Sequence, residues 1–139
     1  MDDNRLRHSY IVATKMVELG KKRFFSEEKL HELFLLGFNH DIGYEYGKSE
    51  SHGEVGAEIL KRSGYKYWQE VYYHGKANSP YKSEYLDILN AADMSVDGCG
   101  MDVGVEKRLE DIKLRHGENS IPYINCVSLV KELKEKGVL

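Results

Sequence analysis

The sequence predicts an all-α fold: a single domain over residues 1–139, built as a bundle of about six to seven helices. Apolar residues recur at three- and four-residue spacing along most of the chain, which is typical of amphipathic helices. The signals of strands, sustained alternation of apolar and polar residues and tight hairpin turns between β-branched runs, are lacking. A chain of 139 residues is also long enough to bury a core without disulfides.

The first two helices are predicted from their periodicity and their capping residues. One runs over about residues 4–19 and ends at Gly20, where a left-handed residue commonly closes a helix. Ser26 caps the next helix, which reaches His40, because a serine hydroxyl accepts a backbone N–H of the first turn. The segment 43–49, which contains glycines and tyrosines, is predicted as a loop.

Further helices complete the predicted bundle. The third begins at Ser49 or Ser51 and ends before Gly64, the fifth is capped by Ser83, and the last carries Pro122 in its first turn. Glycines indicate a loop over residues 98–104. These helices are expected at about residues 51–63, 66–74, 83–95, 105–115 and 122–136.

Composition argues against several classes of protein. The formal net charge is −3 and the basic residues are scattered, so a nucleic-acid polymer is not an expected partner. The longest apolar stretch, residues 33–38, is far shorter than the roughly 20 residues of a membrane span, and residues 1–10 lack the features of a secretory signal. We therefore expect a cytoplasmic protein, in which Cys99 and Cys126 stay as structural thiols.

Ionisable residues lie on apolar faces of five predicted helices. His8 heads the stripe of Val12, Met16 and Leu19 in the first helix. In the second helix the predicted buried stripe, Leu30, Leu33, Phe34, Gly37 and Phe38, continues to Asp41, with His40 beside it. The same spacing places His52, His74 and Asp93 on the apolar faces of the third, fourth and fifth helices.

This pattern favours a metal site. Burying imidazoles and carboxylates without partners costs several kcal/mol each, against a total stability of only about 5–15 kcal/mol. Shared cations remove that cost, and nitrogen and carboxylate ligands favour first-row transition metals over calcium. More groups are present than one tetrahedral site needs, so one or two divalent ions (Fe, Mn, Ni, Co or Zn) are expected. The predicted ligands are His8, His40, Asp41, His52, His74 and Asp93.

The ordered set of these residues, with its flanking sequence, resembles the HD-domain superfamily of metal-dependent phosphohydrolases. The resemblance covers about residues 5–97 and is carried by His8-Ser9, Val12-Ala13, the run from Gly37 to Gly43, His52, Gly56-Ala57, Tyr73-His74-Gly75 and Ala91-Ala92-Asp93. Within the superfamily it is similar to the small bacterial branch of diadenosine tetraphosphate hydrolases. The fold implied is an HD-type helical bundle.

The resemblance also implies roles for the predicted ligands. His8, His40, Asp41 and Asp93 hold one metal, His52 and His74 hold a second, and Asp41 bridges the two. His40 and Asp41 then form the catalytic centre. Many members carry a lysine soon after the His-Asp pair, whereas residues 42–45 here read Ile-Gly-Tyr-Glu, a departure that concerns substrate phosphate and not the metals.

The function expected is hydrolysis of a small phosphate ester, a nucleotide or a dinucleoside polyphosphate, by water activated at the metals. Two alternatives stay open. Some HD-fold proteins with a similar ligand set use a di-iron pair to activate oxygen, and a noncatalytic nucleotide sensor is a third reading. Because every expected metal ligand is present in the sequence, a noncatalytic sensor is the less favoured alternative. Metal analysis with Mössbauer spectroscopy distinguishes an oxygenase from a hydrolase.

Several residues are weaker candidates. Lys48, Lys76 and Arg115 are predicted to bind the substrate's distal phosphate, although solvated surface charge is the simpler reading. Asp97 could act as a base or accept a hydrogen bond from a metal ligand, but an aspartate before glycine usually serves only to form a turn. His31 and His116 are expected at the surface. Four tyrosines could stack on a nucleobase of the substrate, although packing is the more common role: Tyr44, Tyr46, Tyr72 and Tyr73. The last helix either covers the core, the favoured role, or pairs with a second copy in a homodimer.

Overall fold

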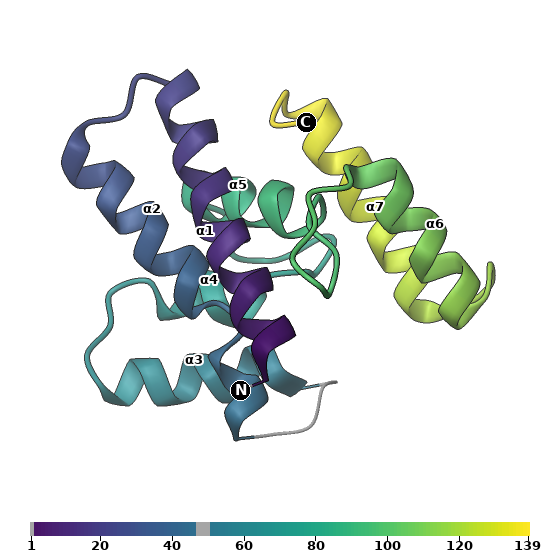
Figure 1. Ribbon diagram of the computed structural model, residues 1–139, viewed down its shortest axis with the longest axis horizontal. Coiled ribbons are helices and arrows are strands. Elements are labelled where there is room, and N and C mark those ends of the chain that lie inside the picture. The colour runs from purple at the N-terminus through teal and green to yellow at the C-terminus, as the bar shows by residue number, and fades with distance from the viewer. Residues whose placement is uncertain (1, 47–50) are drawn as a thin grey trace.

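The computed structural model describes residues 2–46 and 51–139 and confirms the all-α prediction (Figure 1). Within the described residues an isolated β-bridge joins Val96 to Asp102, and the remaining regular structure is helical. The elements are α1 (Asp3–Lys22), α2 (Glu27–Asn39), the 3₁₀ turn η1 (Ile42–Glu45), α3 (His52–Arg62), α4 (Trp68–Tyr73), α5 (Glu84–Asp93), α6 (Val105–His116) and α7 (Ile121–Glu135).

Helix α1 is longer than predicted, because Gly20 does not end it. The helix continues to Lys22, and Phe24, at a φ of 58°, makes the turn instead. A Cβ atom at Gly20 would lie 2.6 Å from Leu33 Cδ1 and 2.9 Å from Leu30 Cδ2. This glycine therefore allows α2 to pack closely on α1, and its left-handed freedom is not used.

Helix α2 packs against α1 and also against α4 and α5. Its buried face therefore differs from the predicted stripe. Leu36 is fully buried, whereas Phe38 is 40% exposed. Leu30, Leu33 and Gly37 are buried as predicted. The periodicity located a single face, but a helix that packs between two neighbours buries residues on both sides of that face. The core beside it contains Val12, Met16, Val71, Ile88 and Leu89.

The segment after α2 is also more ordered than the predicted loop. Residues 42–45 form η1, in which the N–H of Tyr44 donates to the Asp41 carbonyl over 3.0 Å. Gly43 packs directly on the first turn of α3, since a Cβ there would lie 1.7 Å from the His52 carbonyl oxygen. The rest of the predicted loop, apart from Tyr46, lies outside the described residues. Close contact between η1 and α3 therefore brings Asp41 beside His52.

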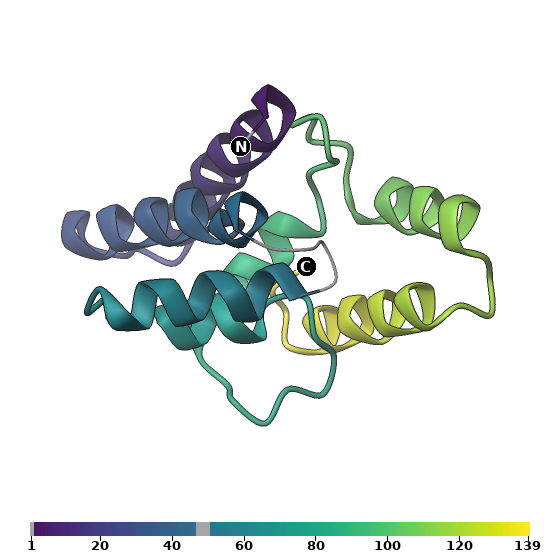
Figure 2. The ribbon, with the colours of Figure 1, turned by 90° about the horizontal axis from the view of Figure 1, so that it is seen from below.

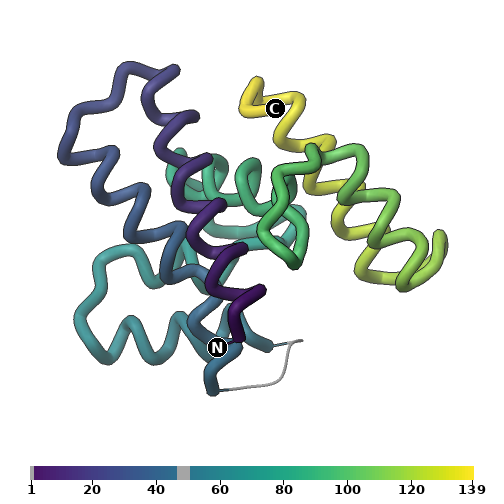
Figure 3. Tube along the Cα trace, in the orientation of Figure 1, coloured from purple at the N-terminus to yellow at the C-terminus, as the bar shows by residue number. Residues whose placement is uncertain are grey.

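Helices α6 and α7 form a hairpin beside the bundle of α1–α5 (Figure 2). A loop leaves α5 and leads into α6, and α7 returns toward α5, as the trace in Figure 3 shows. Leu129, Val130 and Leu133 of α7 are buried against Ala91 and Met94, so this helix covers core as predicted. Ile124, also expected on the apolar face, is 54% exposed.

Hydrogen bonds tie the hairpin to the loop that follows α4. The Asn125 side chain accepts from the Ala77 N–H over 3.0 Å and donates to the Gly75 carbonyl over 2.7 Å. Glu132 accepts from the Asn78 N–H over 2.9 Å. The hairpin is thus anchored next to His74. Across the described residues, no helix has both the length and the apolar character to cross a membrane.

Candidate metal centre

The six predicted ligand residues converge from the ends of five helices. His8 lies in the first turns of α1, His40 and Asp41 follow α2, and His52 opens α3. His74 caps the C-terminus of α4, and Asp93 is the last residue of α5. His40 is fully buried, and His8, Asp41 and His74 are 2–7% exposed. Residues spread over most of the chain therefore meet in one desolvated place.

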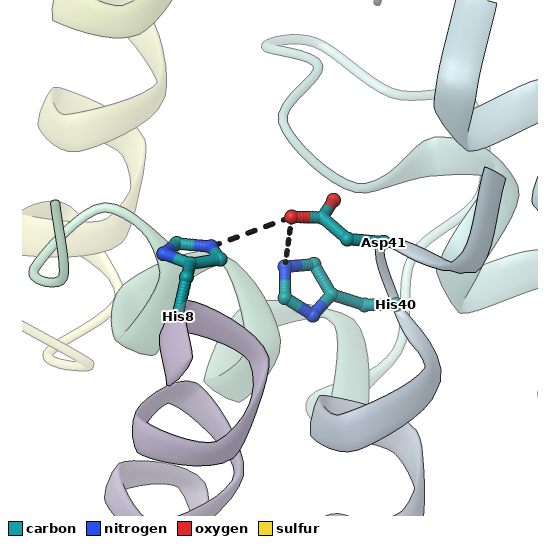
Figure 4. Close-up of side chains that lie close together, drawn as sticks. All are labelled: His8, His40 and Asp41. Carbon is teal, nitrogen blue, oxygen red and sulfur yellow. Dashed lines mark ion pairs between the residues drawn. The ribbon is translucent and has the colours of Figure 1, made fainter. Parts of the chain in front are cut away.

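One group of candidate ligand atoms forms around Oδ2 of Asp41 (Figure 4). His40 Nε2 lies 3.3 Å from both Asp41 Oδ2 and Asp93 Oδ1. His8 Nε2 lies 2.9 Å from Asp93 Oδ1 and 3.5 Å from Asp41 Oδ2. Each of the two imidazole nitrogens thus lies within 3.5 Å of both carboxylate oxygens.

A second group forms around the other oxygen of Asp41. Oδ1 lies 3.1 Å from His52 Nε2 and 3.5 Å from His74 Nε2, and these two nitrogens are 3.1 Å apart. The carboxylate of Asp41 therefore faces one group with each oxygen. This is the arrangement that the resemblance implied for a bridging ligand.

The far nitrogen of three of the rings is held by backbone carbonyls. His8 Nδ1 donates to Asp97 O over 2.8 Å, His40 Nδ1 to Gly37 O over 2.6 Å, and His74 Nδ1 to Val71 O over 2.5 Å. Since a carbonyl only accepts, Nδ1 carries a proton in each ring, which leaves Nε2 as the nitrogen that is available to a metal. Metal-ligating histidines are oriented in this way.

The carboxylates of Asp41 and Asp93 require a positive charge close to them. Nε2 of His40 is buried and has no hydrogen-bond partner among the described residues, although two carboxylate oxygens lie close to it. Burial lowers the pKa of His40, but the charges of Asp41 and Asp93 outweigh it and raise that pKa to about 9. Burial raises the pKa of each of the two carboxyls, yet His40 and the other histidines bring both well below the usual value. Without a metal, a proton on His40 supplies the charge.

The donor set fits divalent transition metals. Each of three overlapping groups offers ligand atoms within 4.8 Å of one another: His8 with His40 and Asp41, His40 with His74 and Asp93, and Asp41 with His52 and His74. Neutral imidazole and ionised carboxylate are the ligands that Mn, Fe, Co, Ni and Zn accept. These residues could therefore hold one ion or two.

A cleft of about 440 Å³ opens over the centre. Two of the predicted substrate-binding residues, Lys76 and Arg115, line it, together with His116. Lys76 is partly neutralised, because its Nζ lies 3.0 Å from Glu54 Oε1 and 4.6 Å from the centre of the Tyr72 ring. The third predicted residue, Lys48, lies outside the described residues. His31 and His116 are exposed, as expected for surface positions.

Arg5 and Tyr44 are site residues with roles that sequence reasoning missed. Arg5 Nη1 lies 3.4 Å from Asp41 Oδ2, and its guanidinium lies 3.8 Å above the Tyr44 ring. That ring in turn stacks on His52, with centroids 4.3 Å apart. A signal for Arg5 existed, since it precedes His8 by three residues and so shares its helix face.

The role of Asp97 is resolved in favour of turn chemistry and an outer contact. Its carboxylate accepts the N–H groups of Cys99 and Met101, each over 2.9 Å, and its backbone carbonyl holds His8. The two cysteines are free thiols: Cys99 is exposed, and Cys126 is half-buried at the wall of the cleft.

The described structure is helical, and four imidazoles and two carboxylates meet in it beneath a cleft. These features define a helical domain with a candidate metal centre. The family model for the HD domain matches residues 5–96, more than half of the chain, and the chain therefore belongs to the HD-domain family. This family consists mostly of metal-dependent hydrolases. Neither the curated proteins nor the solved structures contain a significant match. The matched region includes all six converging residues and ends before α6.

Proposed function

We propose that this protein is a metal-dependent phosphohydrolase acting on a small phosphate ester, such as a nucleotide or a dinucleoside polyphosphate. The observation that carries the proposal is the position of Asp41, whose two carboxylate oxygens face two separate groups of imidazoles at 3.1–3.5 Å. A carboxylate in this position could be shared by two divalent ions, which phosphate-cleaving centres use.

Under this proposal His8, His40, Asp41 and Asp93 would hold one ion, and His52 and His74 would hold the second together with Asp41. Bound divalent ions supply a lowered pKa for water and positive charge beside the phosphoryl oxygens. The backbone carbonyls on Nδ1 of His8, His40 and His74 keep these rings in the tautomer that binding requires.

The reaction is a hydrolysis in which a water oxygen forms a bond to phosphorus and the bond from phosphorus to the leaving oxygen breaks. The water gives up one proton, and one proton is taken up by the leaving oxygen or by solvent. Asp41 and Asp93, whose pKa values are well below the usual range, stay ionised at neutral pH and serve as ligands, so neither is the acid. Arg5, beside Asp41 at the cleft wall, adds positive charge where the phosphoryl group would lie.

The test is phosphate release by metal-replete protein from mononucleotides, dinucleoside polyphosphates and simple phosphate esters. Asp41→Ala should abolish release from every substrate, because both ions lose a ligand. His31→Ala, which removes an exposed histidine away from the centre, should retain full activity. A wild-type protein that releases no phosphate, or an Asp41→Ala protein as active as wild type, would overturn the proposal.

A di-iron oxygenase is the second candidate, because the same donor set with a shared carboxylate also suits two irons. The cleft favours the hydrolase: its lining includes Arg5, Lys76, Arg108 and Arg115, which suit an anionic substrate. Mössbauer spectroscopy on iron-loaded protein separates the two. A stable mixed-valent pair with oxygen uptake and no phosphate release would support the oxygenase.

A further inference from the structure

One face of α6 forms the wall of the cleft opposite the candidate metal centre. The residues of this helix that line the cleft are Arg108, Ile112, Arg115 and His116, which follow one another at helical spacing. Ile112 is buried, so the face is held against the body of the protein. Helix α6 lies beyond residue 96, outside the region that matches the HD domain. This wall is thus an addition to the part of the chain that carries the candidate ligands.

Arg108 is the unusual residue on that wall. Its Nε is buried and makes no hydrogen bond with any residue that the structure describes. The side chain as a whole is half-buried, and its Nε, shielded from solvent, lacks the hydrogen bond that would offset the cost of its removal from water. The charge of Arg108 also acts on Cys126 in the cleft wall. Burial raises the pKa of the Cys126 thiol, the charge of Arg108 lowers this pKa, and the charge of Asp93 raises it. Arg108 therefore lines the same cleft as the candidate ligands, and its buried Nε has no partner among the described residues.

The other cations of the cleft differ in this respect. Arg5 lies 3.4 Å from Asp41 Oδ2, and Lys76 lies 3.0 Å from Glu54 Oε1. Over the described ranges, 2–46 and 51–139, neither Arg108 nor Arg115 forms an ion pair with an acidic side chain. These two arginines are seven residues apart, about 10 Å along the helix at 1.5 Å per residue. Two guanidinium groups, one half-buried and one exposed, thus line the cleft without an ion-pair partner in the described part of the chain.

We propose that Arg108 and Arg115 bind a second anionic group of the substrate, so that the protein selects phosphate chains of two or more groups over monophosphates. The inference rests on the proposed function, because it assumes that the first phosphoryl group lies at the metal centre. One guanidinium group can bind two phosphate oxygens at once, and an arginine without an ion-pair partner can do so without first losing one. The substrate class is then a nucleoside polyphosphate or a dinucleoside polyphosphate.

The test compares Arg108→Gln and Arg115→Gln with Lys107→Ala, which removes a positive charge from an exposed position of α6 outside the cleft. With a nucleoside triphosphate, each arginine variant should lose about 10- to 100-fold in kcat/KM, mainly through KM. With p-nitrophenyl phosphate, which carries one phosphate, each arginine variant should lose far less than with the triphosphate, whereas Lys107→Ala should match wild type with both substrates. Arg108→Lys should recover only part of the loss, because lysine lacks the planar fork.

Binding separates failure of this inference from failure of the proposed reaction. Calorimetry with the magnesium complex of a non-hydrolysable triphosphate should show weaker binding to Arg108→Gln than to wild type and Lys107→Ala. Equal melting temperature and metal content among the variants would establish that each is folded. Arginine variants that bind the triphosphate as tightly as wild type, or that lose binding of inorganic phosphate equally, would overturn the inference even if the protein hydrolyses phosphate esters. If no ester is cleaved but triphosphate binding depends on Arg108, only the reaction is wrong.

Discussion

His40 concentrates the electrostatics of the centre in one ring. It is fully buried, its Nδ1 is committed to the Gly37 carbonyl, and its Nε2 faces two carboxylates. The pKa of about 9 means that, without a metal, this ring is protonated at neutral pH. A metal ion at Nε2 must therefore displace a proton.

The metal-free protein should become less stable as the pH rises from 6.5 to 9. The pKa of His40 is raised from 6.5 to about 9 in the fold, so its stabilising contribution is complete below pH 6.5 and lost as pH passes through 9. The loss should be on the order of 3 kcal/mol. Urea unfolding of chelator-treated protein at pH 6, 7.5 and 9 measures it. His31→Gln should behave like wild type, and a stability that stays constant across this range would contradict the account.

Tyr44 should matter through its ring and not through its hydroxyl. The ring lies between Arg5, at 3.8 Å, and His52, whose centroid is 4.3 Å away. Tyr44→Ala removes this support and should weaken metal binding at His52 and His74 by about 10-fold, as the loss of outer contacts does elsewhere. Tyr44→Phe keeps the stack and is the matched control. Metal titration measures both variants, and equal affinities for them would show that the stack does not orient His52.

The six converging residues could be predicted from the sequence, because each stands on an apolar helix face where an unpaired polar group is costly. Arg5, Tyr44 and Arg108 could not be assigned in this way. A basic residue on a helix is usually solvated. The three-residue spacing from His8 was a signal for Arg5, but only the position of α6 over the cleft distinguishes Arg108 from surface charge. That orientation depends on contacts between segments that are distant in sequence.

Glycine positions carry the packing between α1 and α2, and therefore the distance from His8 to His40. A Cβ atom at Gly37 would lie 2.6 Å from Ala13 Cα and 2.8 Å from Met16 Sδ. Since the first of these atoms is backbone, rotation of a side chain does not relieve the contact. The two helices must instead move apart.

Gly37→Ala should therefore destabilise the protein by about 1–3 kcal/mol, although alanine is the better helix former. Gly98→Ala is the control, because nothing lies within 4 Å of a Cβ there and its effect should stay within about 0.5 kcal/mol. Denaturant unfolding compares the two. A Gly37→Ala protein as stable as wild type would mean that α1 and α2 do not approach as closely as described.

Several helix starts were predictable from serine caps, whereas the end of α1 was not, because packing decides it. Ser26, Ser83 and Ser120 each accept a backbone N–H, and the helices that they cap begin within two residues of the predicted starts. Gly20 was read as a cap because glycine commonly ends helices, but α1 needs it for contact with Leu33. Local sequence does not distinguish these two uses of glycine.

The molecule as a whole joins the matched HD region to a hairpin that completes its cleft. Asn125 makes this connection, since its side chain bonds both Gly75 and Ala77 in the loop after His74. The periodicity predicted α6 and α7 correctly as elements. Their placement over the centre depends on Asn125 and on the buried contacts of α7, and neither is visible in a helical pattern.

Asn125→Ala should loosen the hairpin from the bundle and cost roughly 1–3 kcal/mol of stability, because two hydrogen bonds are lost and their backbone partners are left unpaired. The amide of Ala77 should exchange its hydrogen faster in the variant than in wild type. Asn119→Ala, at an exposed position between α6 and α7, is the control and should change neither quantity. Unchanged exchange at Ala77 in Asn125→Ala would contradict the anchoring role.

If divalent ions neutralise the six converging side chains, the protein binds these ions in a fixed ratio, which metal stoichiometry measures. Protein saturated with Mn²⁺ and freed of excess ion by gel filtration should retain about two ions per chain by mass spectrometry. His31→Ala should retain the same number, His52→Ala about one, and Asp41→Ala fewer than one. Wild-type protein without bound ions, or Asp41→Ala with the full wild-type content, would contradict the account.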